Sequence, residues 1–210
     1  MTGSLAILGT GGHAKVIADT AAEIGWSSIF FFDDRKIEGA VFGRWPFSGS
    51  ASLLAQNVKD FDGVVVGIGS NRVRQGVCST LIAAGGNLIT LIHPHAYVSR
   101  DARVCAGTVV FAGAVIQAGA RIGHGVIVNT GATVDHDCVL ADYVHVSPGV
   151  NLAGGVSVGE CAWVGIGSAV RQNVVIGPDA VVGAGSAVVG DVSAGATVAG
   201  VPARLLSRRG

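Results

Sequence analysis

Charged residues are scarce in this chain: they make up 13% of its 210 residues, and the formal net charge is zero. Nucleic acids and anionic membranes are bound by strongly basic surfaces, so neither is an expected partner. The four cysteines show no C-x-x-C spacing and are too few for a disulfide scaffold, which favours a reducing compartment. Because no secretory leader or membrane-length apolar run is present, we expect a cytoplasmic protein with a small-molecule substrate.

Aliphatic residues, in contrast, recur with a strict period of six: from Val98 to Val188, every sixth residue is valine, isoleucine or leucine, sixteen times in succession. This period matches neither the α-helix repeat nor strand alternation, so each hexad is expected to be a short strand plus a corner. Glycines, which tolerate positive φ, occupy most positions three residues later, from Gly107 to Gly185. Three hexads per coil predict a three-sided parallel β-helix, with one large and one small side chain inside per hexad.

Residues 1–92 show a different pattern, which predicts a small parallel α/β domain before a β-helix domain in residues 93–210. Strands are expected over Ser4–Leu8, Ser28–Phe32 and Val64–Gly67, with helices after the first and the third. The second half of a complete dinucleotide-binding domain is missing, which disfavours NAD as a ligand.

Two segments of this first domain are candidates for ligand contact. The glycine-rich turn after the first strand would let the backbone approach a phosphate at a helix N-terminus. The acids that end the second strand stand where a carboxylate meets a ribose or sugar hydroxyl, although a solvated turn is an equal alternative. The residues concerned are Gly11, Gly12, His13, Asp33 and Asp34.

The column of corner glycines is interrupted at Asp137 and Tyr143, and function is expected where a regular pattern is locally abandoned. With eighteen residues per coil, His136 has Ala118 below it and Gly154 above it, so its ring would project beside open space. A histidine beside carboxylates suits a general base, because a carboxylate fixes the imidazole tautomer and raises its basicity. An ordinary surface histidine is the alternative reading.

Eight short motifs run along nearly the whole chain: Gly9-Thr10-Gly11-Gly12-His13, Asp33-Asp34, Gly67-Ile68-Gly69-Ser70-Asn71, His93-Pro94, Asn129-Thr130, Asp135-His136-Asp137-Cys138, His145-Val146-Ser147 and Gly200-Val201-Pro202-Ala203-Arg204. In this order they closely resemble the sialic-acid O-acetyltransferase-like family of hexapeptide-repeat acyltransferases. Its best-understood members are acetyl-CoA-dependent N-acetyltransferases of nucleotide-linked amino sugars of the bacillosamine and perosamine type. The resemblance implies a left-handed coil, although the general rule for parallel crossovers favours the right-handed form.

The resemblance also implies roles for single residues. His136 would take the proton from the sugar amine, and Asp137 would raise its basicity, although Asp135 remains an alternative orienting acid. Aspartate stands at this position where some members of the family have glutamate. Acetyl-CoA would contact His145, Ile166, Ala184 and, through its phosphates, Arg204, with Arg208 and Arg209 either sharing that role or forming an ordinary basic tail. The nucleotide sugar would contact Gly11, Gly12, His13, Asp33, Asp34 and Gly69.

The reaction that the resemblance implies is N-acetylation of a 4-amino-4,6-dideoxy sugar on UDP or GDP, such as GDP-perosamine, in the biosynthesis of surface polysaccharides or other glycans. O-acetylation of sialic acid or another sugar is the alternative. The transfer would be direct and would need no metal. Family members form homotrimers with CoA in the groove between neighbouring prisms, and the same assembly is expected here.

Two other classes of function stay open. A zinc-dependent hydratase would need clustered histidines, and although five are available in the repeat region, their spacing places them at different parts of the coil: His93, His95, His124, His136 and His145. A non-enzymatic sugar-binding scaffold would leave the interruption at residues 135–143 unexplained. Cys138 is disfavoured as an acyl-carrying nucleophile because it falls in a column of inward-facing small residues.

Overall fold

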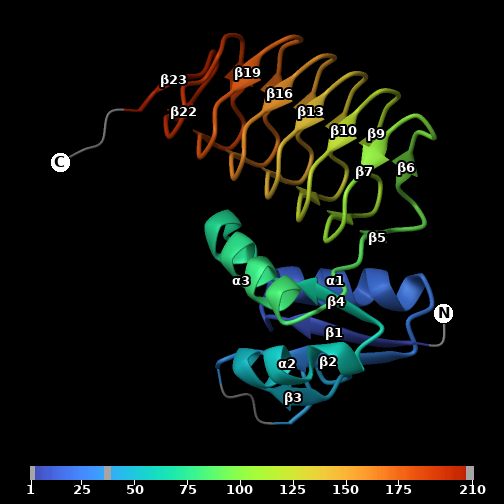
Figure 1. The fold of residues 1–210 in the computed structure, drawn as a ribbon. Helices are drawn as coiled ribbons and strands as arrows, with labels where there is room; N and C mark the ends of the chain where they lie inside the picture. The colour runs from blue at the N-terminus through green and yellow to red at the C-terminus, as the bar shows by residue number, and fades with distance from the viewer. Residues whose placement is uncertain (1–2, 36–38, 207–210) are drawn as a thin grey trace. The chain divides into compact units, whose positions relative to one another are not determined.

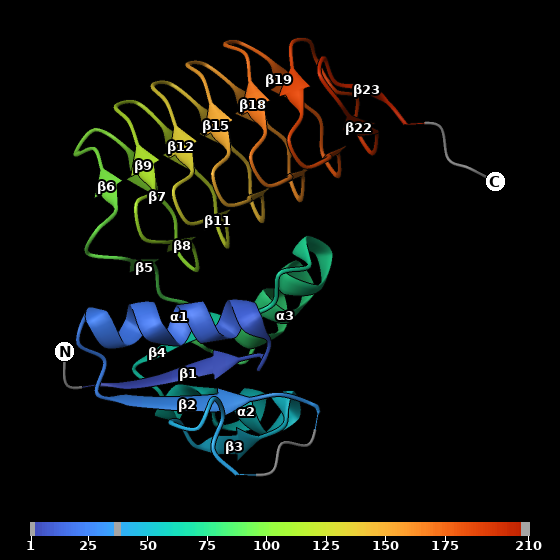
Figure 2. The same cartoon turned by 180° about the vertical axis from the view of Figure 1, so that it is seen from behind.

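The computed structural model describes residues 3–35 and 39–206 and divides the chain into two compact units, Met1–Pro94 and His95–Gly210 (Figures 1 and 2). The sequence placed this boundary two residues earlier, after residue 92. Within the described ranges, every helix is too short or too polar to cross a bilayer.

The N-terminal unit is built on a four-stranded sheet of order β3-β2-β1-β4, in which every pair is parallel. Helix α1 lies on one face of this sheet, and helices α2 and α3 lie on the other (Figures 1 and 2). The elements are β1 (Ser4–Leu8), α1 (Gly12–Glu23), β2 (Ser28–Phe32), β3 (Phe47–Gly49), α2 (Ala51–Asn57), the 3₁₀ turn η1 (Val58–Asp60), β4 (Gly63–Val66), α3 (Asn71–Ala83) and β5 (Leu91–Ile92).

The central strands are continuous apolar runs because both faces of the sheet are covered, and Leu5, Ala6 and Ile7 of β1 are fully buried. The end of β4 passes so close to the start of α1 that a Cβ on Gly67 would lie 2.6 Å from the Cβ of Ala14. This close approach requires glycine, and it brings the turns after β1 and β4 to the same edge of the sheet.

The C-terminal unit is a three-sided parallel β-helix in which each coil takes eighteen residues, since Ile127 pairs with His145 and His145 with Trp163. One side carries β6 (Tyr97–Val98), β9 (Val115–Ile116), β12 (Thr133–Val134), β15 (Asn151–Leu152), β18 (Ala169–Val170) and β21 (Ala187–Val188). The next side carries β7 (Arg103–Val104), β10 (Arg121–Ile122), β13 (Val139–Leu140), β16 (Ser157–Val158) and β19 (Val175–Ile176). The third side carries β8 (Val109–Val110), β11 (Ile127–Val128), β14 (His145–Val146), β17 (Trp163–Val164), β20 (Val181–Val182), β22 (Thr197–Ala199) and β23 (Arg204–Leu205).

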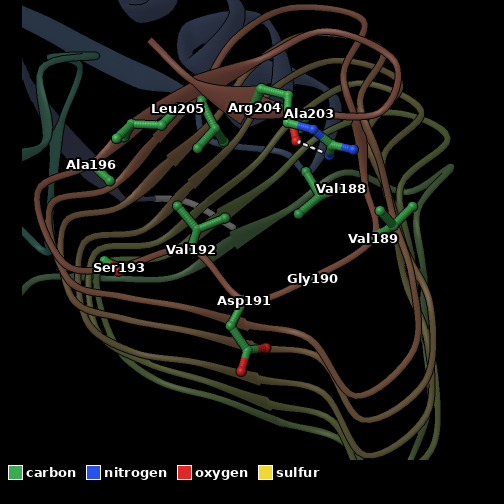
Figure 3. Close-up of a pocket in the computed structure, with 11 residues that line it drawn as sticks. Val188, Val189, Gly190, Asp191, Val192, Ser193, Ala196, Ala203, Arg204 and Leu205 are labelled. Carbon is green, nitrogen blue, oxygen red and sulfur yellow. Dashed lines mark hydrogen bonds between the residues drawn. The ribbon is translucent and has the colours of Figure 1, made fainter. Parts of the chain in front are cut away.

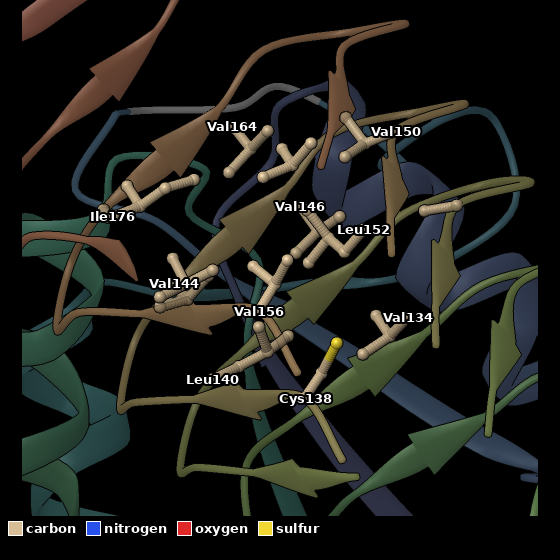
Figure 4. Close-up of a cluster of buried hydrophobic side chains, with 14 of the residues drawn as sticks. Val134, Cys138, Leu140, Val144, Val146, Val150, Leu152, Val156, Val164 and Ile176 are labelled. Carbon is tan, nitrogen blue, oxygen red and sulfur yellow. The ribbon is translucent and has the colours of Figure 1, made fainter. Parts of the chain in front are cut away.

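The interior of the prism is the stack of aliphatic side chains that the sequence pattern predicted. Val134, Leu140, Val146 and Leu152 point inward from successive strands, each at most 1% exposed (Figure 4). Smaller inward residues alternate with them, among them Ala132. In a solenoid each coil contacts only the coils next to it. The burial of aliphatic side chains between neighbouring coils is therefore the main source of stability.

The corners correct one part of the sequence interpretation. Asp137 and Tyr143 interrupt the column of glycines, yet their φ angles of 59° and 58° are the same left-handed corner that the glycines make. Cys161, Asn173 and Asp179 also adopt it, far from the segment singled out by its missing glycines. Each non-glycine corner costs about 1–2 kcal/mol of backbone strain, but the absence of glycine does not by itself mark a functional site.

Candidate active site

His136 lies at the corner between β12 and β13, and Asp137 orients its ring. His136 Nδ1 lies 2.9 Å from Asp137 Oδ2, so Nδ1–H donates to the carboxylate and Nε2 is the acceptor in the neutral ring. Asp135 binds the backbone instead, since its Oδ1 accepts from the His136 N–H at 2.7 Å. Asp137 is therefore the acid that fixes the tautomer, and aspartate is long enough to reach the ring.

The surroundings of His136 make it a stronger base than an isolated imidazole. The hydrogen bond to Asp137 raises the pKa of His136 above its usual value, and the negative charges of Asp135 and Asp137 add to this effect while desolvation opposes it. The side chain is 64% exposed, so Nε2 is accessible to a substrate. A Cβ on Gly154, one coil further on, would collide with the ring, so glycine at this position leaves room for His136 as it is placed here.

A cleft of about 380 Å³ lies on the side of the prism that carries β14, β17 and β20. It brings together three of the residues assigned to acetyl-CoA, namely His145, Ile166 and Ala184. Trp163 and Val181 also line it. A largely apolar cleft with a few polar groups is the usual form of a small-molecule site, and His136 is not among the residues that line it.

The orientation of His145 in this cleft is fixed from two sides. Asn129 Oδ1 accepts from the Thr130 N–H at 2.8 Å, which turns the amide nitrogen of Asn129 toward His145 Nε2 at 3.2 Å. The Trp163 ring stacks on the imidazole with centroids 5.9 Å apart, and its Nε1–H donates to Ser147 Oγ at 2.6 Å. Counting eighteen residues from His145 predicts Trp163 above it in a partly apolar wall, and the strand pairing confirms this position. The hydrogen bond from Asn129, which the sequence offered only as part of a motif, is seen in the structure alone.

Arg204 is not brought together with the other residues assigned to acetyl-CoA. It lines a different cavity, of about 500 Å³, at the end of the prism, with Val188, Val192 and Leu205 (Figure 3). Its Nη1 donates to the carbonyl of Ala203 at 2.9 Å, the bond dashed in Figure 3. The contact of Arg204 with the CoA phosphates stays a prediction. Within one chain, β23 turns back at the end of the coil and places Arg204 outside the His145 cleft. Arg208 and Arg209 lie outside the described residues.

All six residues assigned to the nucleotide sugar line one cavity of about 500 Å³ at the carboxyl edge of the N-terminal sheet: Gly11, Gly12, His13, Asp33, Asp34 and Gly69. Gly11 caps helix α1 without a side-chain hydrogen bond. A Cβ on Gly11 or Gly12 would meet no atom within 4 Å, so the space beside this helix N-terminus is open. Open amide groups and the helix dipole suit an anionic ligand.

Two arginines that the sequence did not single out contribute to this region: Arg35 lines the cavity, and Arg74 binds two of the residues that line it. Arg35 binds Asp33, with Nη2 2.9 Å from Oδ2. Arg74 of α3 is 2% exposed and donates from Nη1 to the carbonyls of Ile68 and Gly69, both at 3.1 Å. An arginine in a helix usually indicates a solvated face, so only the structure reveals that this one is buried.

Burial lowers the pKa of His13 to about 4, and the positive charge of Arg74 acts in the same direction. His13 is therefore neutral at physiological pH and contributes an uncharged imidazole to the cavity. Asp34 supports the cavity wall, since its Oδ1 accepts from the Ala51 N–H at 2.9 Å at the start of α2.

The remaining chemical groups of the repeat offer no rival centre. Cys138 is fully buried, its Sγ lies 3.2 Å from the Ala153 carbonyl, and desolvation raises the pKa of its thiol, so it is a poor nucleophile. Over residues 3–35 and 39–206 no three histidine, cysteine, aspartate or glutamate side chains gather as a metal site would require.

Comparison with known proteins identifies the family to which this chain is related. Residues 4–81 match the PglD N-terminal domain. A GDP-perosamine N-acetyltransferase of Escherichia coli is 31% identical over 86% of this chain and 83% of its own length. A UDP-N-acetylbacillosamine N-acetyltransferase of Bacillus subtilis is 40% identical over 52% of this chain, which spans about half (51%) of that relative. The chain belongs to the bacillosamine and perosamine N-acetyltransferase family.

Solved structures agree with this membership over nearly the whole chain. The acetyltransferase domain of PglB from Neisseria gonorrhoeae, in complex with acetyl coenzyme A, has a TM-score of 0.93 at 43% identity and covers 98% of this chain and 100% of that one. PerB from Caulobacter crescentus, in complex with CoA and GDP-perosamine, has a TM-score of 0.90 at 39% identity and covers 99% of each chain. The coil is accordingly the left-handed β-helix of this family of acetyl-CoA-dependent sugar N-acetyltransferases.

Proposed function

We propose that this chain transfers the acetyl group of acetyl-CoA to the amino group of a nucleotide-linked 4-amino-4,6-dideoxy sugar. The observation that carries the proposal is His136, whose Nδ1 is held by Asp137 and whose exposed ring lies beside Gly154. The acceptor class follows the relatives that act on UDP-linked bacillosamine and GDP-perosamine. Such a reaction fits the biosynthesis of surface polysaccharide, and four reduced cysteines fit the cytoplasm.

The transfer needs no covalent intermediate on the protein. The amine nitrogen attacks the thioester carbonyl carbon, His136 Nε2 takes the proton that the nitrogen loses, and the carbon–sulfur bond breaks to release CoA. Because the hydrogen bond to Asp137 stabilises the imidazolium, the base is strengthened at the moment it becomes charged. The cleft of His145, Ile166 and Ala184 would hold the thioester arm, and the cavity of Gly11 and Asp33 would hold the nucleotide.

The proposed assembly is a homotrimer. His136 lies at the corner between the β12 and β13 sides, whereas the His145 cleft lies on the β14 side and does not include it. A second copy placed against that cleft would bring its own His136 to the thioester, completing the site between subunits. Sedimentation of a stable, fully active monomer would contradict this assembly.

The reaction is tested by following thiol release from acetyl-CoA with a panel of acceptors. UDP- and GDP-linked 4-amino sugars, matched sugars with a hydroxyl in place of the amine, and sialic acid would be compared at equal concentration. N-acetylation of one amino sugar with a high kcat/KM is the expected result. Preference for sialic acid or another hydroxyl acceptor would establish an O-acetyltransferase instead, and no release with any acceptor would favour a binding scaffold.

Replacing Asp137 with asparagine is expected to shift the pH dependence of catalysis. His136 accepts a proton only when it is neutral, that is, above its pKa, and the Asp137 carboxylate raises that pKa. Without the carboxylate the pKa falls, so the acidic limb of the kcat/KM profile moves to lower pH, while the maximal rate drops because the base is weaker. Asp101→Asn, an exposed acid two coils away in the same column, is the matched control. An unmoved acidic limb in Asp137→Asn would refute the pairing.

A further inference from the structure

The carboxylate of Asp33, in the nucleotide cavity of the N-terminal unit, is already saturated with hydrogen bonds. Its Oδ2 accepts from the Thr10 N–H at 2.9 Å, from Thr10 Oγ1 at 2.7 Å and from Arg35 Nη2 at 2.9 Å. Its Oδ1 accepts from the Arg35 N–H at 2.9 Å and from Arg35 Nε at 3.1 Å. A carboxylate offers about four lone-pair sites, so these five donors leave none for a ligand hydroxyl.

The exposures of the Asp33 and Arg35 side chains also indicate that a ligand would meet Arg35 and not Asp33. The Asp33 side chain is 12% exposed, whereas the Arg35 side chain that covers it is 68% exposed. The hydrogen bonds from Arg35 hold the pKa of Asp33 far below its usual range, so the carboxylate stays ionised and keeps its partner. Where a nucleotide-binding fold of this type usually presents an acid to a ribose, this chain presents a guanidinium.

Hydrogen bonds also hold the Arg35 guanidinium beside the N-terminus of α1. Nε and Nη2 are held by Asp33, and Nη2 donates to Thr10 Oγ1 at 2.9 Å, directly before the Gly11 cap of α1. Among residues 3–35 and 39–206, Arg35 Nη1 has no hydrogen-bond acceptor, so its two N–H groups remain for a ligand. Because Asp33 already fixes one edge of the guanidinium, Arg35 would lose little side-chain entropy when the other edge binds a phosphate.

We propose that Arg35 binds the diphosphate of the nucleotide-linked substrate, and that Asp33 is a positioning residue that holds Arg35 rather than a ligand for a sugar or ribose hydroxyl. The proposal rests on the proposed function for the identity of the ligand in this cavity. Arg35 and the open N–H groups at Gly11 and Gly12 would contact the phosphate oxygens together, with the buried charge of Arg74 behind them.

Equilibrium binding of UDP and GDP to the purified full chain tests the proposal by calorimetry. Whichever of UDP and GDP the wild-type protein binds, Arg35→Gln is expected to lower its affinity by about tenfold to a hundredfold, the range of one charge-assisted contact. Arg35→Lys keeps the positive charge but loses the forked guanidinium, so its affinity should lie between those of the wild type and Arg35→Gln. Arg44→Gln is the matched control, since that guanidinium lies over the Trp45 ring at 4.9 Å and lines another cavity.

Asp33→Asn and the double variant separate positioning from direct contact. If Asp33 acts only through Arg35, Asp33→Asn weakens diphosphate binding in the wild-type background and adds nothing in Arg35→Gln, and it leaves uridine and guanosine binding unchanged. Additive losses, or an equal loss for nucleosides, would overturn the positioning role. Arg35→Gln with the affinity of Arg44→Gln would overturn the diphosphate contact while leaving the proposed function standing. Wild-type protein that binds neither UDP nor GDP would reject both.

Discussion

Replacement of His136 by asparagine is expected to lower kcat by about 10²–10⁴-fold, the usual contribution of a general base. Asparagine has a side chain of similar reach and polarity but cannot accept a proton near neutral pH. The His136 side chain is 64% exposed and takes no part in the packed interior, so the fold and both substrate cavities should persist. The loss should therefore appear in kcat, with the dissociation constants of CoA and the nucleotide sugar nearly unchanged.

Steady-state kinetics with varied acetyl-CoA and varied nucleotide sugar, together with calorimetry of each ligand, would measure this. His124→Asn is the control, because His124 is an exposed histidine at a different corner of the prism. Near-normal turnover of His136→Asn with intact binding would remove His136 from the chemistry. Loss of both bindings, in contrast, would indicate a structural role for the ring.

The β-helix was predictable from the sequence because its period is enforced by geometry. Every hexad must turn one large aliphatic residue inward, as Val134 and Leu140 do, so a substitution that broke the period would expose or overfill the core. Strand β3 and helix α2 lacked such a signal. They are three and seven residues long, and their clearest mark, the Ser50 side chain accepting from the Leu53 N–H, is recognisable only when the helix start is already known.

The neighbours of His136 were predictable from the coil spacing, and the motifs of the N-terminal unit located its cavity, but the side-chain pairings in that cavity were not predictable. Counting eighteen residues from His136 leads to Gly154, and the structure places that glycine against the ring. No arithmetic couples Arg35 to Asp33, because the turn after β2 has no repeat and the pairing depends on side-chain conformation. The separation of Arg204 from the His145 cleft was not predictable for a related reason: the final strands turn antiparallel, with Val198 opposite Leu205, and leave the register that the earlier coils share.

Gly154→Ala is expected to reduce kcat by about 10- to 100-fold without unfolding the protein, since displacement of a catalytic group by about 1 Å can cost that much. A Cβ at this position would lie 2.5 Å from Cε1 and 3.0 Å from Cδ2 of His136, well inside van der Waals contact. The backbone of Gly154 is not in the left-handed region, so alanine fits the corner and only the ring must move. Because His136 is exposed, the ring can swing outward, and the hydrogen bond to Asp137 would be strained or lost.

A matched control and a double variant make this expectation specific. Gly190 occupies the same corner two coils further on, and a Cβ there would meet nothing within 4 Å, so Gly190→Ala should leave kcat and the melting temperature unchanged. In the His136→Asn background, Gly154→Ala should have little further effect, because the base it displaces is already gone. A Gly154→Ala enzyme with normal kcat, or one whose loss persists in full without His136, would show that this glycine does not act by holding room for the catalytic ring.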